Sequence, residues 1–577
     1  MPTHPPLPIG TADFRKIREA GKLYVDKTAL IDQVVADPAE VLLLPRPRRF
    51  GKTTNLSTLR YFFERSPEDL SALFADLAVW RSEPARARFQ RHPVIYLTLK
   101  DLKKTSFDEC LAGLGFFITQ LYSEHQSILE AGQLTGSEAD DFRAILERRA
   151  DQTLIETSLR QLSIYLHRRH GEPVVILLDE YDTPLHSAFF HGYYDAAVAL
   201  FRGLLGGAFK DNRSLYKGVL TGILRVAKES IFSDLNNLAV HSLLEPRYAP
   251  YFGFTEPEVV DLARRADHRG SLDELRDWYN GYLFGGVVIY NPWSVLSALD
   301  RGVCAPYWVN TSANELIREL LLRATGDSHL ELEAVLRGES VHKPLTEHTV
   351  LRDIYRDTTA LWSFLLFSGY LAARDVRRDE LGGLSADLGL PNRELRSVFA
   401  NLFKSWLQAG LGGPRQVEDM SRALLRGDLE QFEHHLARLL VESASTFDTA
   451  GTERMPPEQL YHAFVLGLLL HLQPDHAVRS NRESGYGRAD VLVVPRRPGL
   501  PGVVLELKVK SRRRTLAQTL ADGLQQLADQ DYAAELRAAG AAPIHEIAVA
   551  FDGKRVLVGK RPPPRSRPAA RAPRRRA

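Results

Sequence analysis

The sequence predicts a multidomain α/β protein, and three observations support this prediction. The chain has 577 residues, which corresponds to roughly three to four domains at about 150 residues each. Short apolar runs alternate with helical patterns at the start, a mainly helical pattern follows, and a second α/β pattern begins near residue 456. We therefore expect folded domains and a terminal tail at residues 1–254, 255–440, 441–559 and 560–577.

The composition excludes several classes of protein. With 44% hydrophobic and 25% charged residues, the chain is neither mostly disordered nor collagen-like nor a coiled coil. Two cysteines, Cys110 and Cys304, cannot build a disulfide framework or a four-thiolate zinc site, so we expect a reducing compartment. The start resembles no signal peptide, and the apolar stretch 464–472 is about half of what a bilayer needs. We expect a soluble, cytoplasmic protein without a membrane partner.

The first domain is expected to hold a parallel sheet with crossover helices. Its apolar runs lie at 41–44, 94–97, 174–178 and 218–222. The run at 174–178 is apolar without alternation, which is typical of a strand that is covered on both faces.

A phosphate-binding loop is predicted after the first of these strands. The triplet Gly51-Lys52-Thr53 matches the second half of a P-loop, in which the lysine reaches the β- and γ-phosphates and the threonine hydroxyl binds Mg²⁺. Backbone N–H groups at the helix start, including that of Thr54, would complete the anion site. Arg46 stands where the pattern has its first glycine, and such a triplet also occurs by chance.

A second element at the carboxyl end of a strand favours a nucleotide site. Asp179 and Glu180 follow the buried run, where ligands bind in open α/β sheets. Asp179 would hold Mg²⁺ and Glu180 would polarise water, although an acidic pair can also cap a helix. Thr221, at the end of another strand, could sense the γ-phosphate. Arg225 could contact phosphate or a neighbouring subunit, or could be an ordinary surface arginine.

A pair of carboxylates with a lysine is predicted near the C-terminus. In 503–510 the alternation places Glu506 and Lys508 on one strand face together with Val504. A hairpin would bring Asp490 beside Glu506, and two carboxylates suit Mg²⁺. Lys508 would orient or deprotonate the attacking water and offset charge on a scissile phosphate. The alternative is a solvated face of an ordinary strand.

Other side chains could extend this second site. Glu458 is a candidate metal ligand, with His462 one helical turn away and Glu483 as a further candidate. Glu458 could equally be a first-turn carboxylate of a helix. Gln526 and Tyr532 could face a substrate or simply pack.

The last residues form a basic segment. Residues 560–577 contain eight lysines and arginines and no acidic residue, with five prolines between them. This composition predicts a segment that does not fold. It could bind nucleic-acid phosphates or could be only a solvated tail.

Further motifs extend along most of the chain. They are Tyr24–Lys27, Arg46–Thr53, Leu178–Asp182, Thr221–Arg225, Phe252–Glu256, Trp278–Tyr282, Tyr290–Pro292, Gly369–Leu371, Pro391–Glu394, Tyr461–Phe464, Gly487–Asp490 and Glu506–Lys508. Together they resemble a prokaryotic family of AAA-ATPase-like proteins with a C-terminal PD-(D/E)XK nuclease-like domain. The resemblance implies a P-loop module fused to a restriction-endonuclease-like fold. It also implies that Arg46 replaces the glycine throughout the family.

The resulting functional hypothesis is an ATP- and Mg²⁺-dependent nuclease that acts on nucleic acid, with DNA as the expected substrate. ATP and Mg²⁺ are the expected cofactors, and a homo-oligomer is left open. One alternative is a nucleotide-controlled switch whose nuclease-like domain binds nucleic acid or protein without cutting. A second alternative is a plain NTPase with a degenerate C-terminal domain.

Overall fold

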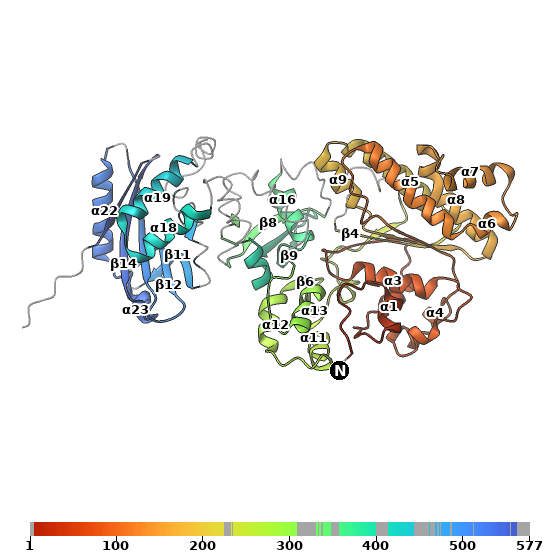
Figure 1. Cartoon of the computed structure of the whole chain (residues 1–577), viewed down its shortest axis with the longest axis horizontal. Coiled ribbons are helices and arrows are strands. Elements are labelled where there is room, and N and C mark those ends of the chain that lie inside the picture. The colour runs from red at the N-terminus through yellow and green to blue at the C-terminus, as the bar shows by residue number, and fades with distance from the viewer. Residues whose placement is uncertain are drawn as a thin grey trace, which may run out of the picture. The chain divides into compact units, whose positions relative to one another are not determined.

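The computed structural model divides the chain into two compact units. Unit 1 comprises residues 1–314 and 338–398, and unit 2 comprises 315–337 and 399–577 (Figure 1). The structure describes residues 5–223, 232, 235–308, 331–332, 334–335, 338–347, 357–399, 414–442, 461, 465, 468–469, 472, 475–484, 487–511, 513–553 and 555–561. Side chains are described in these ranges except at 414–416, 441–442 and 480–488. Among the described helices, none is long and apolar enough to span a bilayer.

Unit 1 contains a five-stranded parallel sheet in the order β2-β3-β4-β1-β5. The strands are β1 (Val41–Pro45), β2 (Val94–Thr98), β3 (Val174–Asp179), β4 (Leu215–Gly222) and β5 (Leu238–Val240). The first four contain the four apolar runs in the sequence, and every residue of β3 is buried. The prediction of a parallel sheet with crossover helices is confirmed, and β5 is an additional short edge strand.

Helices cover both faces of this sheet (Figure 1). Phe14, Leu30 and Phe62 pack with Leu42 and Val175 in one apolar cluster. The helices of the first 210 residues are α1 (Phe14–Glu19), α2 (Ala29–Ala36), α3 (Lys52–Phe63), α4 (Glu83–Arg86), α5 (Phe107–Glu124), α6 (Ser127–Glu130), α7 (Gly136–Leu146), α8 (Gln152–His170), α9 (Thr183–His191) and α10 (Tyr194–Phe209), with short 3₁₀ turns at Ser71–Leu73 and Ala78–Arg81.

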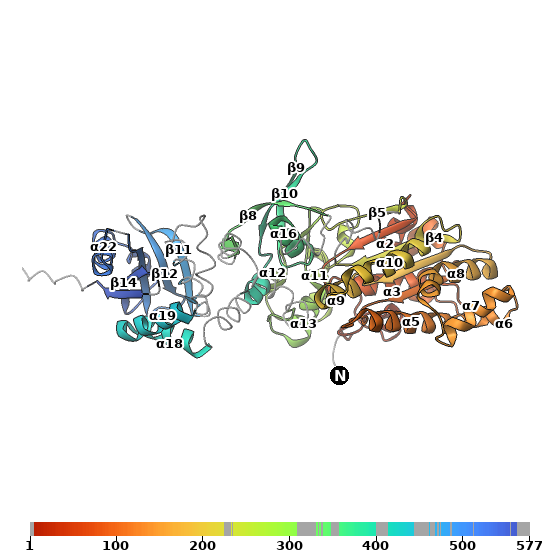
Figure 2. The ribbon, with the colours of Figure 1, turned by 90° about the horizontal axis from the view of Figure 1, so that it is seen from above.

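The rest of unit 1 combines helices with short strands. The helices are α11 (Glu256–Arg265), α12 (Leu272–Tyr279), α13 (Pro292–Arg301) and α16 (Thr358–Phe367), with a 3₁₀ turn at Ala249–Tyr251. The strands that the sequence did not reveal are β6 (Tyr282–Phe284), β7 (Val287–Ile289), β8 (Val341–Leu345), β9 (Ala372–Arg378) and β10 (Leu384–Gly389). The last three form an antiparallel sheet in the order β8-β10-β9, and the β9–β10 hairpin projects from the unit (Figure 2).

A buried carboxylate joins distant parts of this region. Glu394 is fully buried, and both of its oxygens accept hydrogen bonds from the Ser294 hydroxyl at 2.9 Å. The backbone N–H of Trp308 donates to Oε1 at 2.8 Å. Burial raises the pKa of Glu394 to about 7, despite these donors.

This raised pKa predicts a loss of stability as pH rises. The pKa is higher in the folded chain than its ordinary value of 4.5, so the folded state binds the proton more tightly. The resulting stabilisation is complete below pH 4.5 and is lost as pH passes 7, with a limit of about 3 kcal/mol. Urea unfolding near pH ~5 and pH ~8 should show this difference, and Glu394→Gln should abolish it. If the free energy of unfolding of Glu394→Gln depends on pH as that of the wild type does, Glu394 is not the group responsible.

Unit 2 is built on a mixed five-stranded sheet in the order β11-β12-β13-β14-β15. Its strands are β11 (His476–Ser484), β12 (Gly487–Pro495), β13 (Gly502–Val509), β14 (Ile544–Asp552) and β15 (Arg555–Lys560). Only the β13–β14 pair is parallel among the described pairings. The predicted hairpin of the two central strands is therefore present, with β11 and β15 added at the edges.

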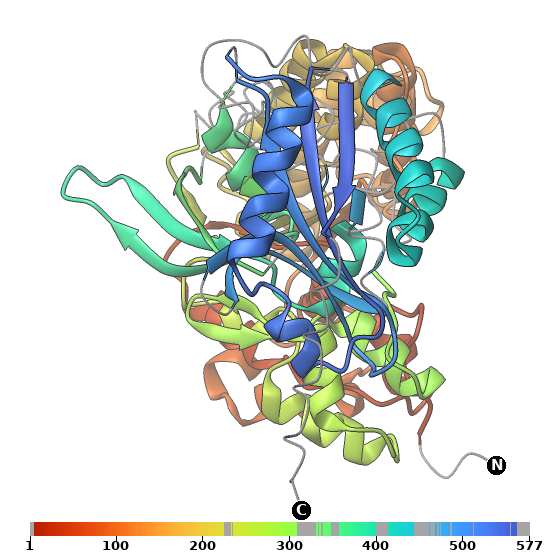
Figure 3. The ribbon, with the colours of Figure 1, turned by 90° about the vertical axis from the view of Figure 1, so that its left-hand side faces the viewer.

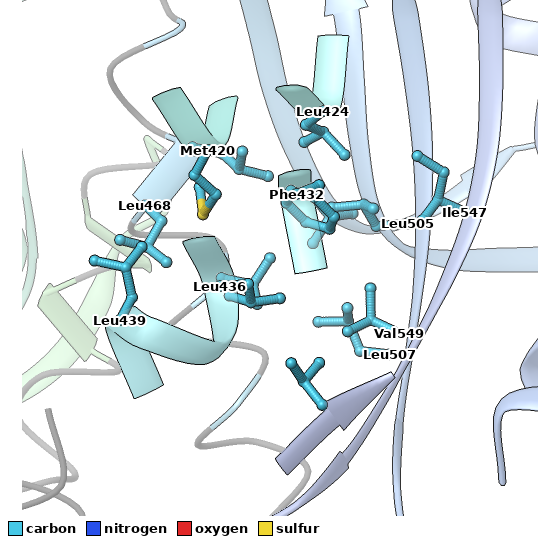
Figure 4. Packing of buried hydrophobic residues seen from close by; sticks show 14 of the residues in the cluster. Met420, Leu424, Phe432, Leu436, Leu439, Leu468, Leu505, Leu507, Ile547 and Val549 are labelled. Carbon is cyan, nitrogen blue, oxygen red and sulfur yellow. The ribbon is translucent and has the colours of Figure 1, made fainter. Parts of the chain in front are cut away.

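Helices lie on both faces of the unit 2 sheet (Figure 3). On one face α18 (Pro414–Arg426) and α19 (Leu429–Glu442) pack Met420, Phe432 and Leu436 against Leu505 and Val549 (Figure 4). On the other face lies α22 (Leu516–Asp529), followed by α23 (Ala534–Ala538). The apolar alternation in β13 thus separates a closed core from a face that carries polar side chains.

Two sequence boundaries in unit 2 differ from expectation. The sequence pattern of 515–538 predicts one long helix, but the structure has two, because Gln530 takes an extended backbone (φ −121°, ψ 142°) after Asp529. The tail expected from residue 560 begins later, since Lys560 ends β15. The Arg561 guanidinium donates to the Leu527 carbonyl at 2.8 Å and to Glu546 at 3.0 Å.

Candidate functional sites

The predicted P-loop connects β1 to α3 as expected. All its residues are described, and within it the left-handed backbone occurs only at Arg49 (φ 70°) and Gly51 (φ 82°). Glycine adopts this conformation without strain, whereas an arginine does so at a cost of about 1–2 kcal/mol. Arg46, at the place of the missing first glycine, needs no left-handed backbone. The absence of that glycine is therefore compatible with the loop.

The Lys52 side chain is hydrogen-bonded to the backbone of its own loop. Its ammonium donates to the Arg46 and Pro47 carbonyls, each at 2.9 Å, which uses two of the three donors of an ammonium group. The side chain is buried, and burial lowers its pKa although the Glu180 and Asp179 carboxylates oppose that shift. The lysine is positioned at the first turn of α3, where backbone N–H groups favour anions.

Three separate elements meet at Asp179. The Thr53 hydroxyl from α3 donates to Asp179 Oδ2 at 2.7 Å, and the Thr221 hydroxyl from β4 donates to Oδ1 at 2.8 Å. Asp179 is fully buried, and burial raises its pKa against the two hydroxyl donors. A hydroxyl beside a buried carboxylate is a donor set of hard oxygens, which fits Mg²⁺. The structure thus brings together Thr53, Asp179 and Thr221.

The residues after Asp179 show local strain and a further buried carboxylate. Glu180 has a left-handed backbone (φ 51°), and its side chain accepts from the Thr183 hydroxyl at 3.1 Å. Asp182 is buried and accepts from the backbone N–H of Ile223 at 2.8 Å, which fixes the end of β4. The sequence does not reveal this contact of Asp182, although the residue belongs to the acidic run after β3. Arg225 lies outside the described residues.

Asp490 and Glu506 lie on the same face of the unit 2 sheet. In the antiparallel β12–β13 pair, Val491 is opposite Leu505, so the next positions outward are Asp490 and Glu506. Directly opposed residues of antiparallel strands point to one face. Next to this pair, the acceptor for the Leu507 N–H is a side chain and not a backbone carbonyl. The Leu507 N–H donates to Asp490 Oδ2 at 2.8 Å. The predicted pairing of the two carboxylates is present.

Glu506 is the more unusual of the two carboxylates. It is 1% exposed, and its Oε1 accepts from the Lys508 ammonium at 2.8 Å. Its Oε2 is buried and has no hydrogen-bond partner among the described residues. Burial and the charge of Asp490 raise the pKa of Glu506 to about 7, against the effect of Lys508. A buried oxygen without a donor is costly unless another group satisfies it.

Helix α22 lies directly over the carboxylates and the lysine. A Cβ at Gly523 would lie 3.1 Å from Ala548 Cβ and 3.4 Å from Lys508 Cγ, so the helix packs closely against β13 and β14 at this glycine. Gln526 donates to the Tyr532 hydroxyl at 3.1 Å, a contact that favours the packing interpretation of this pair. Helix α22 therefore covers this site on one side.

The oxygen donors of Asp490 and Glu506 are of the type that a divalent cation takes. Carboxylate oxygens are the ligands that Mg²⁺ prefers, commonly one or two from the protein together with substrate phosphate, and the unpartnered Glu506 oxygen is available as a ligand. Among the described residues, no group of three or more acidic, histidine or cysteine side chains is arranged to hold a metal. Glu458, His462 and the Glu483 side chain lie outside the described set.

Fold and sites together define a P-loop ATPase-like module joined to a PD-(D/E)XK nuclease-like module. A model described as predicted AAA-ATPase matches residues 8–232, and a model of the PD-(D/E)XK nuclease superfamily matches residues 456–561. The curated relative "Uncharacterized protein in vnfD 5'region" of Azotobacter chroococcum mcd 1 is 30% identical over 567 residues, covering 96% of this chain and 98% of that protein. The chain belongs to this family of AAA-ATPase-like proteins with a C-terminal nuclease-superfamily domain.

Two solved structures are also similar. The ORC1 protein of Aeropyrum pernix, solved in complex with DNA, is 15% identical, with 68% of this chain and 91% of that chain covered and a TM-score of 0.20. The Aeropyrum pernix ORC2 protein, solved as ADPNP-ADP complexes, is 12% identical, with 69% and 96% covered and a TM-score of 0.20. TM-scores this low transfer neither ligands nor function.

Proposed function

We propose that the protein binds and hydrolyses ATP and uses its C-terminal module as a Mg²⁺-dependent nuclease that cleaves DNA phosphodiesters. The observation that carries this proposal is the arrangement of Asp490, Glu506 and Lys508. Two carboxylates share a sheet face, one of them has a buried oxygen without a partner, and an ammonium group lies 2.8 Å from the other oxygen of that carboxylate. Family membership in the nuclease superfamily supports the same chemistry.

Each residue of the nuclease module has a distinct task in this proposal. Asp490 and Glu506 hold Mg²⁺, which when bound supplies Lewis-acid stabilisation of the developing phosphate charge. Lys508 orients or deprotonates the attacking water and offsets charge on the scissile phosphate. The hydrogen bond from the Leu507 N–H holds the Asp490 carboxylate beside Glu506. Hydrolysis breaks the P–O bond and adds water across it.

The residues of the ATPase module have distinct tasks as well. Lys52 and the α3 backbone N–H groups bind the phosphates, and Thr53 with Asp179 holds Mg²⁺. Thr221 shares Asp179 with Thr53 through a 2.8 Å hydrogen bond, which lets it respond to the γ-phosphate. Glu180 orients the water for hydrolysis, and its left-handed backbone is the kind of local strain found at functional sites.

A cleavage assay on purified full-length protein tests this proposal. Supercoiled and linear DNA are incubated with Mg²⁺ or EDTA, with ATP, a non-hydrolysable analogue or no nucleotide. We expect cleavage with Mg²⁺ and none with EDTA. If DNA remains intact under every nucleotide condition while it is still bound, the non-cutting binding switch replaces the nuclease.

The basic tail gives a separate prediction about nucleic acid. Residues 562–577 lie outside the described part and contain six arginines, whereas Lys560 ends β15 and Arg561 is hydrogen-bonded to Leu527. Deleting 562–577 should weaken DNA binding and reduce the slope of log K against log salt by up to about 5, because each neutralised phosphate contributes about 0.9. Binding measured by anisotropy between ~50 and ~200 mM salt checks this. An unchanged slope would show that the tail is only solvated.

A further inference from the structure

The Arg46 side chain of the P-loop points into the protein. Arg46 is fully buried, and its Nη1 donates to the Pro45 and His241 carbonyls, each at 2.7 Å. Its guanidinium carbon lies 4.9 Å from the centre of the Phe252 ring and 5.9 Å from that of Phe284. Nε and Nη2 have no hydrogen-bond partner among the described residues. Arg46 therefore packs beneath the loop and does not face a phosphate.

Two neighbours of Arg46 in the loop, Phe50 and Arg49, also contact aromatic rings. The Phe50 ring is buried against Tyr282 and Phe284, with ring centres 4.9 Å and 5.1 Å apart. The Arg49 guanidinium stacks over the Trp293 ring at 4.3 Å.

Backbone contacts fix the loop as well. A Cβ at Gly369 would lie 2.7 Å from Pro47 Cβ, so a side chain at this position would collide with the loop. The Phe50 carbonyl accepts from the backbone N–H of Gly253 at 3.1 Å, and the Arg46 N–H donates to the Gly222 carbonyl at 3.0 Å. Nearly every residue from 46 to 50 thus contacts a part of unit 1 that follows β4.

We infer that the region after the ATPase sheet positions the P-loop for phosphate binding. This support cluster consists of His241, Phe252, Tyr282, Phe284, Trp293 and Gly369. Arg46 and Phe50 are positioning residues that anchor the loop to it, in place of the conformational freedom that a glycine would supply. The inference rests on the proposed ATP binding and adds that the phosphate site is incomplete without residues from 241–369.

Two physical arguments support this role for Arg46. A fully buried guanidinium with donors that lack partners is unfavourable on its own, so its packing must be maintained by the surrounding aromatic rings, which attract cations. Because coupling free energies are reciprocal, a support cluster whose packing favours nucleotide binding is in turn stabilised by bound nucleotide. The first argument predicts an effect of mutation on affinity, and the second predicts an effect of nucleotide on the support cluster.

The test replaces Arg46 by the glycine of the usual P-loop pattern. Affinity for a fluorescent ATP analogue is measured by titration with the full-length chain, wild type and Arg46→Gly. We expect roughly tenfold weaker binding in the variant, within the range of coupling between sites, although the pattern gains its glycine. Equal or tighter binding by Arg46→Gly would overturn the inference.

A second variant keeps the test decisive if Arg46→Gly does not fold. Phe284→Ala alters the support cluster at β6 without touching the loop sequence, and Phe142→Ala removes an equally buried ring from α7 as the matched control. We expect Phe284→Ala to weaken nucleotide binding several-fold, and Phe142→Ala to leave it unchanged. Equal affinities of the two variants would again refute the role of the cluster.

Hydrogen exchange provides a readout that does not depend on catalysis. The ATP analogue should slow amide exchange at Tyr282–Ile289 in the wild type and less so in Phe284→Ala. Equal rates of amide exchange with and without the bound ATP analogue would contradict the inference. If the wild type binds no nucleotide at all, the proposed ATP binding fails instead, which separates the two outcomes.

Discussion

Replacing Asp490 by asparagine is expected to reduce Mg²⁺-dependent DNA cleavage by about 10³-fold while ATP binding remains unchanged. A catalytic metal ion generally contributes several kcal/mol of transition-state stabilisation, and each ~1.4 kcal/mol is tenfold in rate. Asparagine removes the negative charge but keeps an oxygen that can accept the Leu507 N–H now bound to Asp490 Oδ2. The local fold should therefore survive, and the loss should be chemical. Initial cleavage rates and nucleotide titrations on the same preparation measure both effects.

The matched control for this experiment is Asp522→Asn. Asp522 lies on α22 in the same unit, and its carboxylate pairs with Arg514 at 3.1 Å on the surface. An exposed ion pair of this kind contributes little, so cleavage should be preserved. Cleavage by Asp490→Asn at the wild-type rate would place the nuclease site elsewhere. Equal loss in both variants would indicate damage to the module as a whole.

Replacing Lys52 by alanine is expected to weaken ATP binding by about 10²-fold. A charge-assisted hydrogen bond contributes about 1.5–3 kcal/mol, and each ~1.4 kcal/mol is tenfold in affinity. The variant also leaves the Arg46 and Pro47 carbonyls without the donor that holds them at 2.9 Å, so the free energy of unfolding should fall by about 1–3 kcal/mol. Titration with a fluorescent ATP analogue and urea unfolding measure the two effects.

Lys217 offers a control with nearly the same environment. Its buried ammonium donates to the Asp37 and Ala39 carbonyls at 2.8 and 2.6 Å, near the opposite end of β4 from Thr221. Lys217→Ala should lose similar stability but keep its affinity for ATP. If both variants bind ATP equally, the role assigned to Lys52 is wrong.

Much of the fold could be predicted because its central strands are apolar and fully covered. The four runs that became β1 to β4 show this, as does Val504, whose place beside Glu506 follows from alternation alone. The strands that were not predicted lack that signal. β9 contains three arginines, β8 contains Pro344, and β5 has only three partly buried residues. Such strands form because a neighbouring strand offers backbone partners, which a sequence pattern does not record.

The candidate sites also combine residues whose placement could be predicted with one, Arg46, whose placement could not. Chain order and strand ends placed Thr53, Asp179 and Thr221 together, since carboxyl ends of parallel strands meet at one edge. Alternation and a hairpin placed Asp490 beside Glu506. The inward course of Arg46 could not be predicted, because a loop arginine normally faces water, and its aromatic partners lie some two hundred residues further along. Tertiary packing, rather than local pattern, decides such cases.

The most direct test is an anomalous diffraction measurement on crystals grown with Mn²⁺ and an ATP analogue. The nuclease proposal predicts a peak within about 2.1 Å of oxygens from both Asp490 and Glu506. A second peak beside Thr53 and Asp179 would show that the ion has entered the crystal. A peak at the nucleotide site together with none between Asp490 and Glu506 would contradict the shared metal and, with it, the proposed hydrolysis.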